Sequence, residues 1–151
     1  MEFFTNTVTC EGAADGEPRK LAPGDGVAPS PDGRYLMVQL NETEGIRLAK
    51  LDVAGGRPEP IPLNLGSLQF WNGAQLSPNA VAPDGRIVFP IDSPDSWFES
   101  VGIIDPRSGR VERVPTNFSG DIHFPSWTKD GRIVASALQI RSSLWRFRPE
   151  K

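Results

Sequence analysis

The sequence of 151 residues predicts an all-β fold built from repeated units of four antiparallel strands. Three observations support this prediction. A pentapeptide ending in Asp-Gly-Arg occurs three times, a second Gly-Arg turn follows the first two copies at a nearly constant distance, and no stretch shows helical periodicity over ten or more residues. Two kinds of turn that recur at fixed offsets indicate a structural unit rather than a chance match.

The Asp-Gly-Arg motifs are predicted to be tight hairpin turns. They read SPDGR at 30–34, APDGR at 82–86 and TKDGR at 128–132, so that their glycines are separated by 52 and 46 residues. Glycine accepts a positive φ, and aspartate tolerates it while it bonds to the local backbone. We therefore expect a structural role for the turn residues Asp32, Gly33, Asp84, Gly85, Asp130 and Gly131.

Strands are expected on both sides of each motif. First strands are predicted at 26–30, 79–83 and 123–127, and second strands at 35–40, 87–90 and 133–138. Third strands are predicted at 45–53, 99–105 and 142–148. Fourth strands follow the second turn, at 57–63 and 110–116. Proline cannot donate to a ladder, so the prolines in these fourth strands predict that they lie at a sheet edge.

Four antiparallel strands in a repeat of about 40–50 residues are typical of a β-propeller blade. The alternative is a β-sandwich whose turns are similar by accident. The predicted division is outer strands of a preceding blade at 1–22, blades at 23–64 and 65–116 (the latter with an insertion), and a last blade without its outer strand at 117–151. About three blades make half of a six-bladed ring, so we expect an incomplete ring, either a fragment of a longer polypeptide or one of two pairing copies.

The repeat segments also carry a family resemblance. PSPDGRYLMV, APDGRIVF and PSWTKDGRIVA resemble the WD40-like (PD40) repeat of the TolB-type β-propellers. The segment 76–147 is similar to the C-terminal end of bacterial regulators in which such a propeller follows a serine/threonine kinase or winged-helix DNA-binding domain. The resemblance implies a six-bladed propeller that binds proteins or ligands, often outside the cytoplasm. Any kinase activity would reside in an upstream domain that this chain lacks.

Composition narrows the function classes. The net charge of −3 gives no basis for nucleic-acid binding, and no apolar run approaches the roughly 20 residues that span a bilayer. Cys10 is the single cysteine, so the chain can form no internal disulfide, and the cysteine count does not indicate an oxidising or a reducing compartment. The N-terminus lacks the features of a signal peptide. The localisation is therefore unknown: periplasmic if the chain belongs to a membrane-anchored regulator, and cytoplasmic otherwise.

Asp121 and His123 are the first candidate binding residues. They lie two positions apart in a predicted innermost strand, so their side chains share a face at the mouth of the expected channel. Together they could bind a polar ligand or a metal, but one histidine and one carboxylate are too few for a zinc site. We therefore predict no metal site and no cofactor. The alternative is a histidine bonded to a backbone carbonyl.

Trp71 and Trp97 are the other candidate binding residues. They lie in segments that interrupt the repeat, at 67–79 and 92–100, and such insertions map to the faces where propellers bind. An exposed tryptophan there could contact a partner, and the alternative is packing of each loop on its own blade. Trp127 and Trp145 fall within the repeat and are predicted to be core residues.

The leading functional hypothesis is a non-enzymatic binding, sensing or scaffolding propeller segment, the C-terminal part of a larger bacterial regulator. It would take a protein, a peptide or a small polar ligand on one face. One alternative is part of a propeller hydrolase or lactonase with a channel metal, which needs several acidic or histidine side chains at one channel mouth. Another is a structural spacer for an attached kinase or DNA-binding domain. No catalytic residue is predicted, and no GxSxG motif is present.

Overall fold

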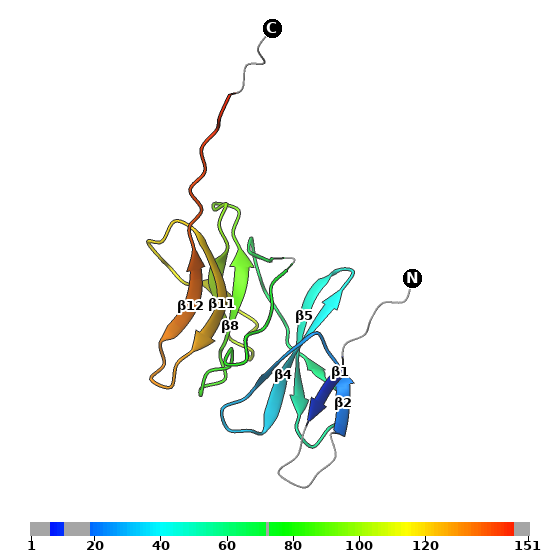
Figure 1. The fold of residues 1–151 in the computed structure, drawn as a ribbon. Helices are drawn as coiled ribbons and strands as arrows, with labels where there is room; N and C mark the ends of the chain where they lie inside the picture. The colour runs from blue at the N-terminus through cyan, green and yellow to red at the C-terminus, as the bar shows by residue number, and fades with distance from the viewer. Residues whose placement is uncertain (1–6, 11–18, 72, 147–151) are drawn as a thin grey trace.

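The computed structural model describes residues 7–10, 19–71 and 73–146, with side chains from residue 19 onward. Within these ranges the secondary structure consists of strands and turns without a helix, and all ladders between strands are antiparallel (Figure 1). No helix in the described ranges could therefore span a membrane. The prediction of an all-β fold with antiparallel sheets is confirmed.

Two sheets have four strands each and follow the chain order. The first contains β3 (Gly26–Pro29), β4 (Tyr35–Glu42), β5 (Gly45–Asp52) and β6 (Glu59–Pro60). The second contains β7 (Gln69–Phe70), β8 (Ile87–Asp92), β9 (Ser100–Ile104) and β10 (Val111–Arg113). The fourth strands, β6 and β10, lie at the sheet edges, where the prolines of their segments predicted them to be.

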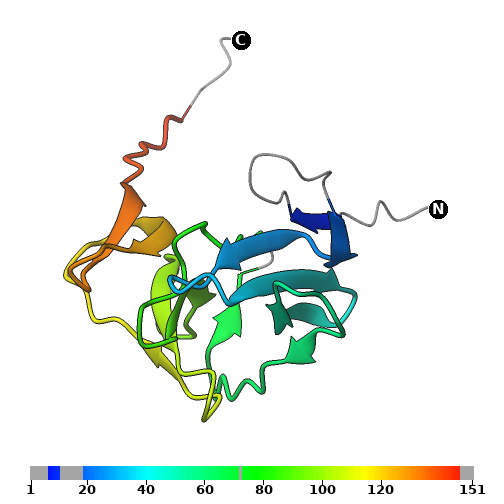
Figure 2. The same ribbon diagram turned by 90° about the horizontal axis from the view of Figure 1, so that it is seen from below.

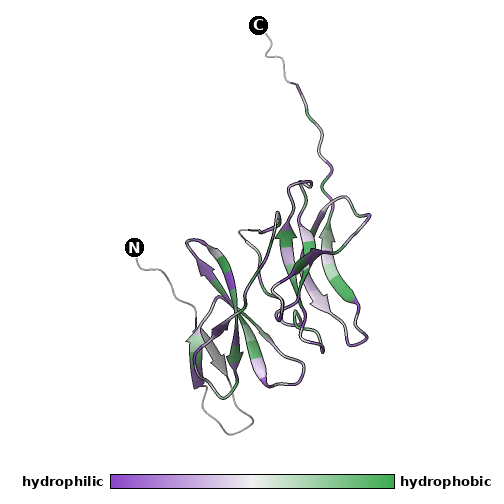
Figure 3. Ribbon diagram, turned by 180° about the vertical axis from the view of Figure 1, so that it is seen from behind, coloured by the Kyte–Doolittle hydropathy of each residue, from purple (hydrophilic) through white to green (hydrophobic). Residues whose placement is uncertain are grey.

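Two further sheets have two strands each. One contains β1 (Thr7–Cys10) and β2 (Arg19–Pro23), and the other contains β11 (Asp121–Trp127) and β12 (Ile133–Leu138). In Figure 2 the four sheets follow one another in chain order along a curved path, so that the two-stranded sheets lie at its opposite ends. Apolar residues run along the strands and hydrophilic residues occupy the turns, as Figure 3 shows.

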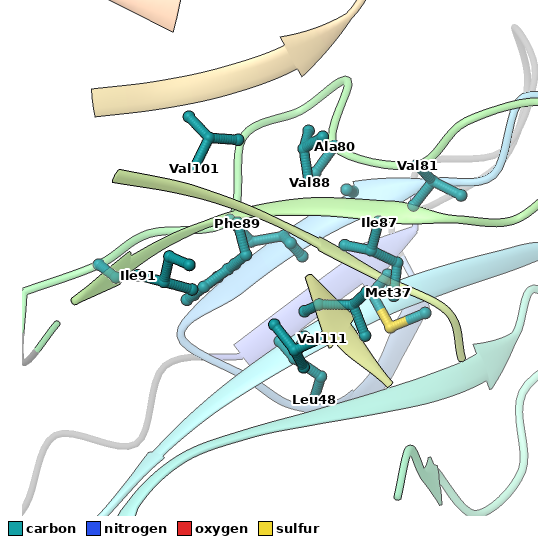
Figure 4. Packing of buried hydrophobic residues seen from close by; sticks show 14 residues of the cluster. Met37, Leu48, Ala80, Val81, Ile87, Val88, Phe89, Ile91, Val101 and Val111 are labelled. Atoms are coloured by element: carbon teal, nitrogen blue, oxygen red, sulfur yellow. The ribbon is translucent and has the colours of Figure 1, made fainter. Parts of the chain in front are cut away.

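The main core lies between the two four-stranded sheets. Met37 and Leu48 from the first sheet pack with Ile87, Phe89 and Ile91 from the second, all at most 1% exposed (Figure 4). Full burial of such a side chain stabilises the fold by about 1.5–3 kcal/mol. This cluster therefore holds the two larger sheets together.

Both two-stranded sheets are attached through apolar contacts of their own. A smaller cluster joins Ala22 of β2 to Val38 and Leu51 of the first four-stranded sheet. At the other end, Ile122, Trp127 and Ile133 pack against the main core from β11 and β12. Each sheet thus packs on the next sheet along the chain.

The first strand of the second sheet differs from the prediction. It comes in two pieces, because β7 pairs with the end of β8 while Val81 forms an isolated bridge to Ile87 at its start. Residues 71–79 separate the two pieces. The insertion that the longer repeat spacing revealed therefore interrupts a strand and does not extend a connection between strands.

The end of the chain also differs. Residues 139–146 form no strand and lead away from the sheets (Figure 1), so the strand predicted at 142–148 is absent over 142–146, and residues 147 and 148 lie outside the described ranges. Trp145 is 81% exposed, and its prediction as a core residue is wrong. In the described ranges β12 pairs only with β11, and the segment that carries Trp145 pairs with no strand. Trp127 is partly buried against the core, with the Arg86 guanidinium 5.3 Å from its ring centroid.

Candidate functional site

The three Asp-Gly-Arg turns share one backbone geometry. The glycine N–H donates to the carbonyl of the residue three positions earlier, which is Ser30, Ala82 or Thr128. The glycines have φ values of 70°, 90° and 78°, whereas Phe124 is the only non-glycine residue with a positive φ in the described ranges. The aspartates of these turns therefore do not adopt the positive φ that this residue type tolerates. They occupy the third position of a four-residue turn, where the left-handed conformation falls on the glycine alone.

Each aspartate of these turns binds the arginine two residues later. The Arg34 Nε donates to the Asp32 carboxylate at 2.6 Å, and the second and third turns repeat the contact at 2.7 and 2.8 Å. Hydrogen bonds from the Ser30 hydroxyl and from the backbone and side chain of Arg34 lower the pKa of Asp32 to about 2. These carboxylates are occupied within their own turns.

The candidate residues Asp121, His123 and Trp71 lie at the opposite end of the sheets from these turns. Asp121 and His123 belong to β11, and the Trp71 ring from the insertion meets the His123 ring edge-on, with 5.9 Å between centroids. Trp71 is 36% exposed. Trp97 is fully exposed in the β8–β9 loop, and the structure does not bring it into this group.

Two acidic residues that the sequence analysis missed complete the group. The register pairs Ile91 with Ser100, so Asp92 and Glu99 face each other one position further along the hairpin. The Glu99 carboxylate Oε2 lies 3.2 Å from His123 Nδ1, and the Glu99 backbone N–H donates to Asp121 Oδ1 at 3.1 Å. Asp92 and Glu99 lie at the two ends of the 92–100 insertion, and this position of two acidic residues is the sequence feature from which they could have been predicted.

A backbone irregularity in β11 lies directly after His123. The ladder with β12 shifts register between His123 and Ser126, and Phe124 within this bulge has a φ of 52°. Such a conformation costs about 1–3 kcal/mol in a non-glycine residue. Bulges of this kind redirect side chains beside binding sites.

We call Trp71, Asp92, Glu99, Asp121 and His123 the acidic site. Burial raises the pKa of Asp92, and the nearby Asp121 carboxylate raises it further. Burial is also the main cause that raises the pKa of Glu99; the charge of His123 opposes the rise, and Asp121 and Asp92 add to it. The carboxylates therefore repel one another where water is partly excluded.

The Glu99 Oε2 atom is buried and accepts no hydrogen bond from any described residue, because the contact with His123 Nδ1 lacks hydrogen-bond geometry. An ammonium or guanidinium group would offer the missing donor and offset the negative charge. The face of a tryptophan also attracts cations. No three His, Cys, Asp or Glu side chains in the described ranges converge closely enough to hold a metal ion.

A cleft of about 450 Å³ lies at the end of the sheets that carries the Asp-Gly-Arg turns. It opens between the two four-stranded sheets beside the first two Asp-Gly-Arg turns, and Tyr35 and Lys50 line it. The Lys50 ammonium lies 4.6 Å from the Tyr35 ring centroid, and Asp32 and Asp84 bind the arginines of their own turns. Asp32, Asp84 and Lys50 therefore already have partners at this cleft, whereas the acidic site contains the buried Glu99 Oε2 atom that accepts no hydrogen bond. We therefore take the acidic site as the stronger candidate.

A scan against protein-family models finds no match for this chain. No curated protein matches its sequence either.

Proposed function

We propose that this chain is a non-enzymatic binding segment of a TolB-like β-propeller that takes the positively charged group of a protein, a peptide or a small polar ligand. The acidic site is the proposed binding site. The observation that carries the proposal is the convergence of three carboxyl groups, an imidazole and a tryptophan from four separate segments at one end of the sheets.

Two features of the fold support the propeller part of the proposal. The four-stranded sheets have the same strand order, and in both of them an Asp-Gly-Arg turn precedes the second strand. They pack face to face in chain order, as successive blades do. The family resemblance supports a place in the C-terminal part of a bacterial regulator, where occupancy of the acidic site would be the sensed signal.

Electrostatics support a cationic ligand. Asp92 and Glu99 both have raised pKa values because burial and neighbouring carboxylates disfavour their charged forms. A bound cation lowers this repulsion, and part of the binding free energy comes from that relief. An anion would add to the repulsion and is not expected to bind.

The single histidine permits a direct test. His123 gives the only imidazole signals in an NMR spectrum, so its chemical shift reports on the site without further assignment. We expect a saturating shift on titration with the peptide acetyl-Gly-Lys-Gly-amide and none with acetyl-Gly-Glu-Gly-amide. Equal responses to both peptides, or no response to the lysine peptide, would overturn the proposal.

Matched substitutions locate the binding. Glu99→Gln and Asp121→Asn preserve side-chain size, and each is expected to weaken lysine-peptide binding about tenfold, as the loss of a charged hydrogen-bond partner does. Asp105→Asn removes the same charge from the β9–β10 turn, where the carboxylate accepts hydrogen bonds from Arg107 and Ser108. This control is expected to bind normally. Equal weakening in all three variants would indicate attraction by net charge alone and would contradict a specific site.

A further inference from the structure

Among the strand edges that are open in the described ranges, one belongs to β12 and one to β1. β12 pairs only with β11, and β1 pairs only with β2, so one edge of each strand has no partner there. Figures 1 and 2 place these strands at opposite ends of the row of sheets. One copy of the chain therefore cannot pair its own β12 with its own β1.

The composition of β1 and β12 differs from that of the outer strands β2, β6 and β10. Natural sheets protect exposed edges with charged residues and proline. Such residues occur in β2 (RKLAP), β6 (EP) and β10 (VER), whereas β1 (TVTC) and β12 (IVASAL) contain neither. On β12, Val134 is 53% exposed and Leu138 is 48% exposed. These two edges have the composition of paired strands.

The two small sheets complement each other in strand number. β11 and β12 flank an Asp-Gly-Arg turn, so they correspond to the first and second strands of a complete sheet. β1 and β2 correspond to the third and fourth strands, with the protected strand β2 at the outside. Joined as β11-β12-β1-β2, they give the order seen in both four-stranded sheets. The second and third strands of those sheets, β4–β5 and β8–β9, pair antiparallel.

We propose that β12 of one copy pairs antiparallel with β1 of a second copy, and that the reciprocal pairing closes a ring of two chains. The ring would contain two complete sheets from each copy and two shared sheets, six in all. The closed shape rests on the proposed propeller arrangement, but the strand pairing does not depend on the acidic site. Pairing satisfies backbone groups that otherwise remain open for aggregation.

Cys10 offers a direct test, because the single cysteine lies on β1. One additional cysteine is placed in turn at each of the six positions of β12, and the purified full chain is oxidised mildly. Residues that face each other across antiparallel strands can form disulfides, and side chains alternate between faces. We expect dimers linked from Cys10 to alternate positions of β12, with peptide mapping to identify each linkage. The control is Ser108→Cys in the β9–β10 turn, which is expected to give no linkage to Cys10.

Light scattering gives the second test. The unmodified chain is expected to have twice its 16.5 kDa mass. The double substitution Val134→Lys and Leu138→Lys charges the exposed face of β12 and should yield a folded monomer, checked by circular dichroism. Ile140→Lys, at a 72% exposed position beyond the strand, should leave the dimer intact.

Three outcomes would overturn the pairing: a monomeric unmodified chain, linkage of Cys10 at all six positions alike, or a dimer that persists after both lysine substitutions. Assemblies larger than two copies would overturn the closed ring. Failure here is distinguishable from failure of the proposed function, since a monomer would still bind the lysine peptide at His123.

Discussion

The Glu99 carboxylate and the His123 imidazole lie side by side, with 3.2 Å between Oε2 and Nδ1, although they come from different sheets. Glu99 precedes β9 in the second sheet, and His123 belongs to β11. The Ile122 N–H also donates to the Glu99 carbonyl at 3.2 Å, which fixes the spacing of the two segments. The acidic site thus depends on the packing of one sheet on the next.

Removal of the Asp92 charge should stabilise the protein at neutral pH. Its pKa is raised above the ordinary value of 3.8 by burial and by the Asp121 carboxylate, so the folded state binds the proton more tightly than the unfolded state. Folding stability therefore falls as the pH rises from 3.8 through the raised pKa. We expect Asp92→Asn to increase the free energy of unfolding at pH 7, measured with urea.

The stability advantage of Asp92→Asn should disappear below pH 3.8, because residue 92 is then uncharged in the unmodified protein as well as in the variant. Asp25→Asn serves as a control, since it removes the same charge from a carboxylate that accepts a hydrogen bond from the Asn41 backbone N–H. An advantage of the same size at pH 3 and pH 7 would contradict the electrostatic explanation.

Replacement of the Ser30 hydroxyl should raise the pKa of Asp32. The hydrogen bond from this hydroxyl is the largest cause of the lowered value of about 2. In Ser30→Ala the titration midpoint of Asp32, followed by carboxyl ¹³C NMR, is expected to move toward 3.8. Because the folded pKa is depressed, the stability that Asp32 contributes is present above pH 3.8 and is lost as the pH falls toward 2.

Ser108→Ala is the matched control for the Asp32 titration. It removes a hydroxyl that donates to Asp105 in a different turn, so Asp32 should keep its midpoint of about 2. An unchanged Asp32 midpoint in Ser30→Ala would show that the hydroxyl does not hold this carboxylate.

Two glycines with the same backbone conformation should respond differently to alanine. Gly33 has a φ of 70° and nothing within 4 Å of an added Cβ, so Gly33→Ala should cost about 1–2 kcal/mol from the left-handed conformation alone. Gly109 has a φ of 73°, but its Cβ would collide with the Pro62 carbonyl. Gly109→Ala should lower the free energy of unfolding by about 1–3 kcal/mol more than Gly33→Ala does, because the added methyl group overpacks this site.

Urea denaturation of both glycine variants gives the comparison directly. The difference between them measures the contact between the β9–β10 turn and the segment at Pro62, where the Asn64 N–H donates to the Gly109 carbonyl at 2.7 Å. Equal losses of stability in the two variants would contradict this close approach.

Local chemistry explains why much of the strand layout could be predicted. The Asp-Gly-Arg turns, the apolar runs after them and the prolines of the fourth strands can each be recognised from a few consecutive residues. The split of the first strand of the second sheet could not be predicted, because the pairing of Gln69 with Asp92 depends on a register that distant residues set. The segment around Trp145 has the composition of a strand, but it pairs with no strand in the described ranges and leaves Trp145 exposed.

The candidate site was predictable only in part for the same reason. Asp121 and His123 share a strand, so their proximity follows from alternation along the chain. Glu99 joins them only through packing between sheets, and Asp92 only through the register of β8 and β9. Trp71 and Trp97 looked equivalent as insertion residues, yet only Trp71 meets His123.

The pairing of aspartate and arginine inside each turn explains why this motif recurs with so little variation. All partners of the Asp32 carboxylate lie within five consecutive residues, and the other two turns repeat the bond between the aspartate carboxylate and the arginine Nε. A pentapeptide that carries its whole bonding network can be duplicated along a chain without matching changes elsewhere. It can also form before distant strands meet, so each copy can begin the folding of its own hairpin.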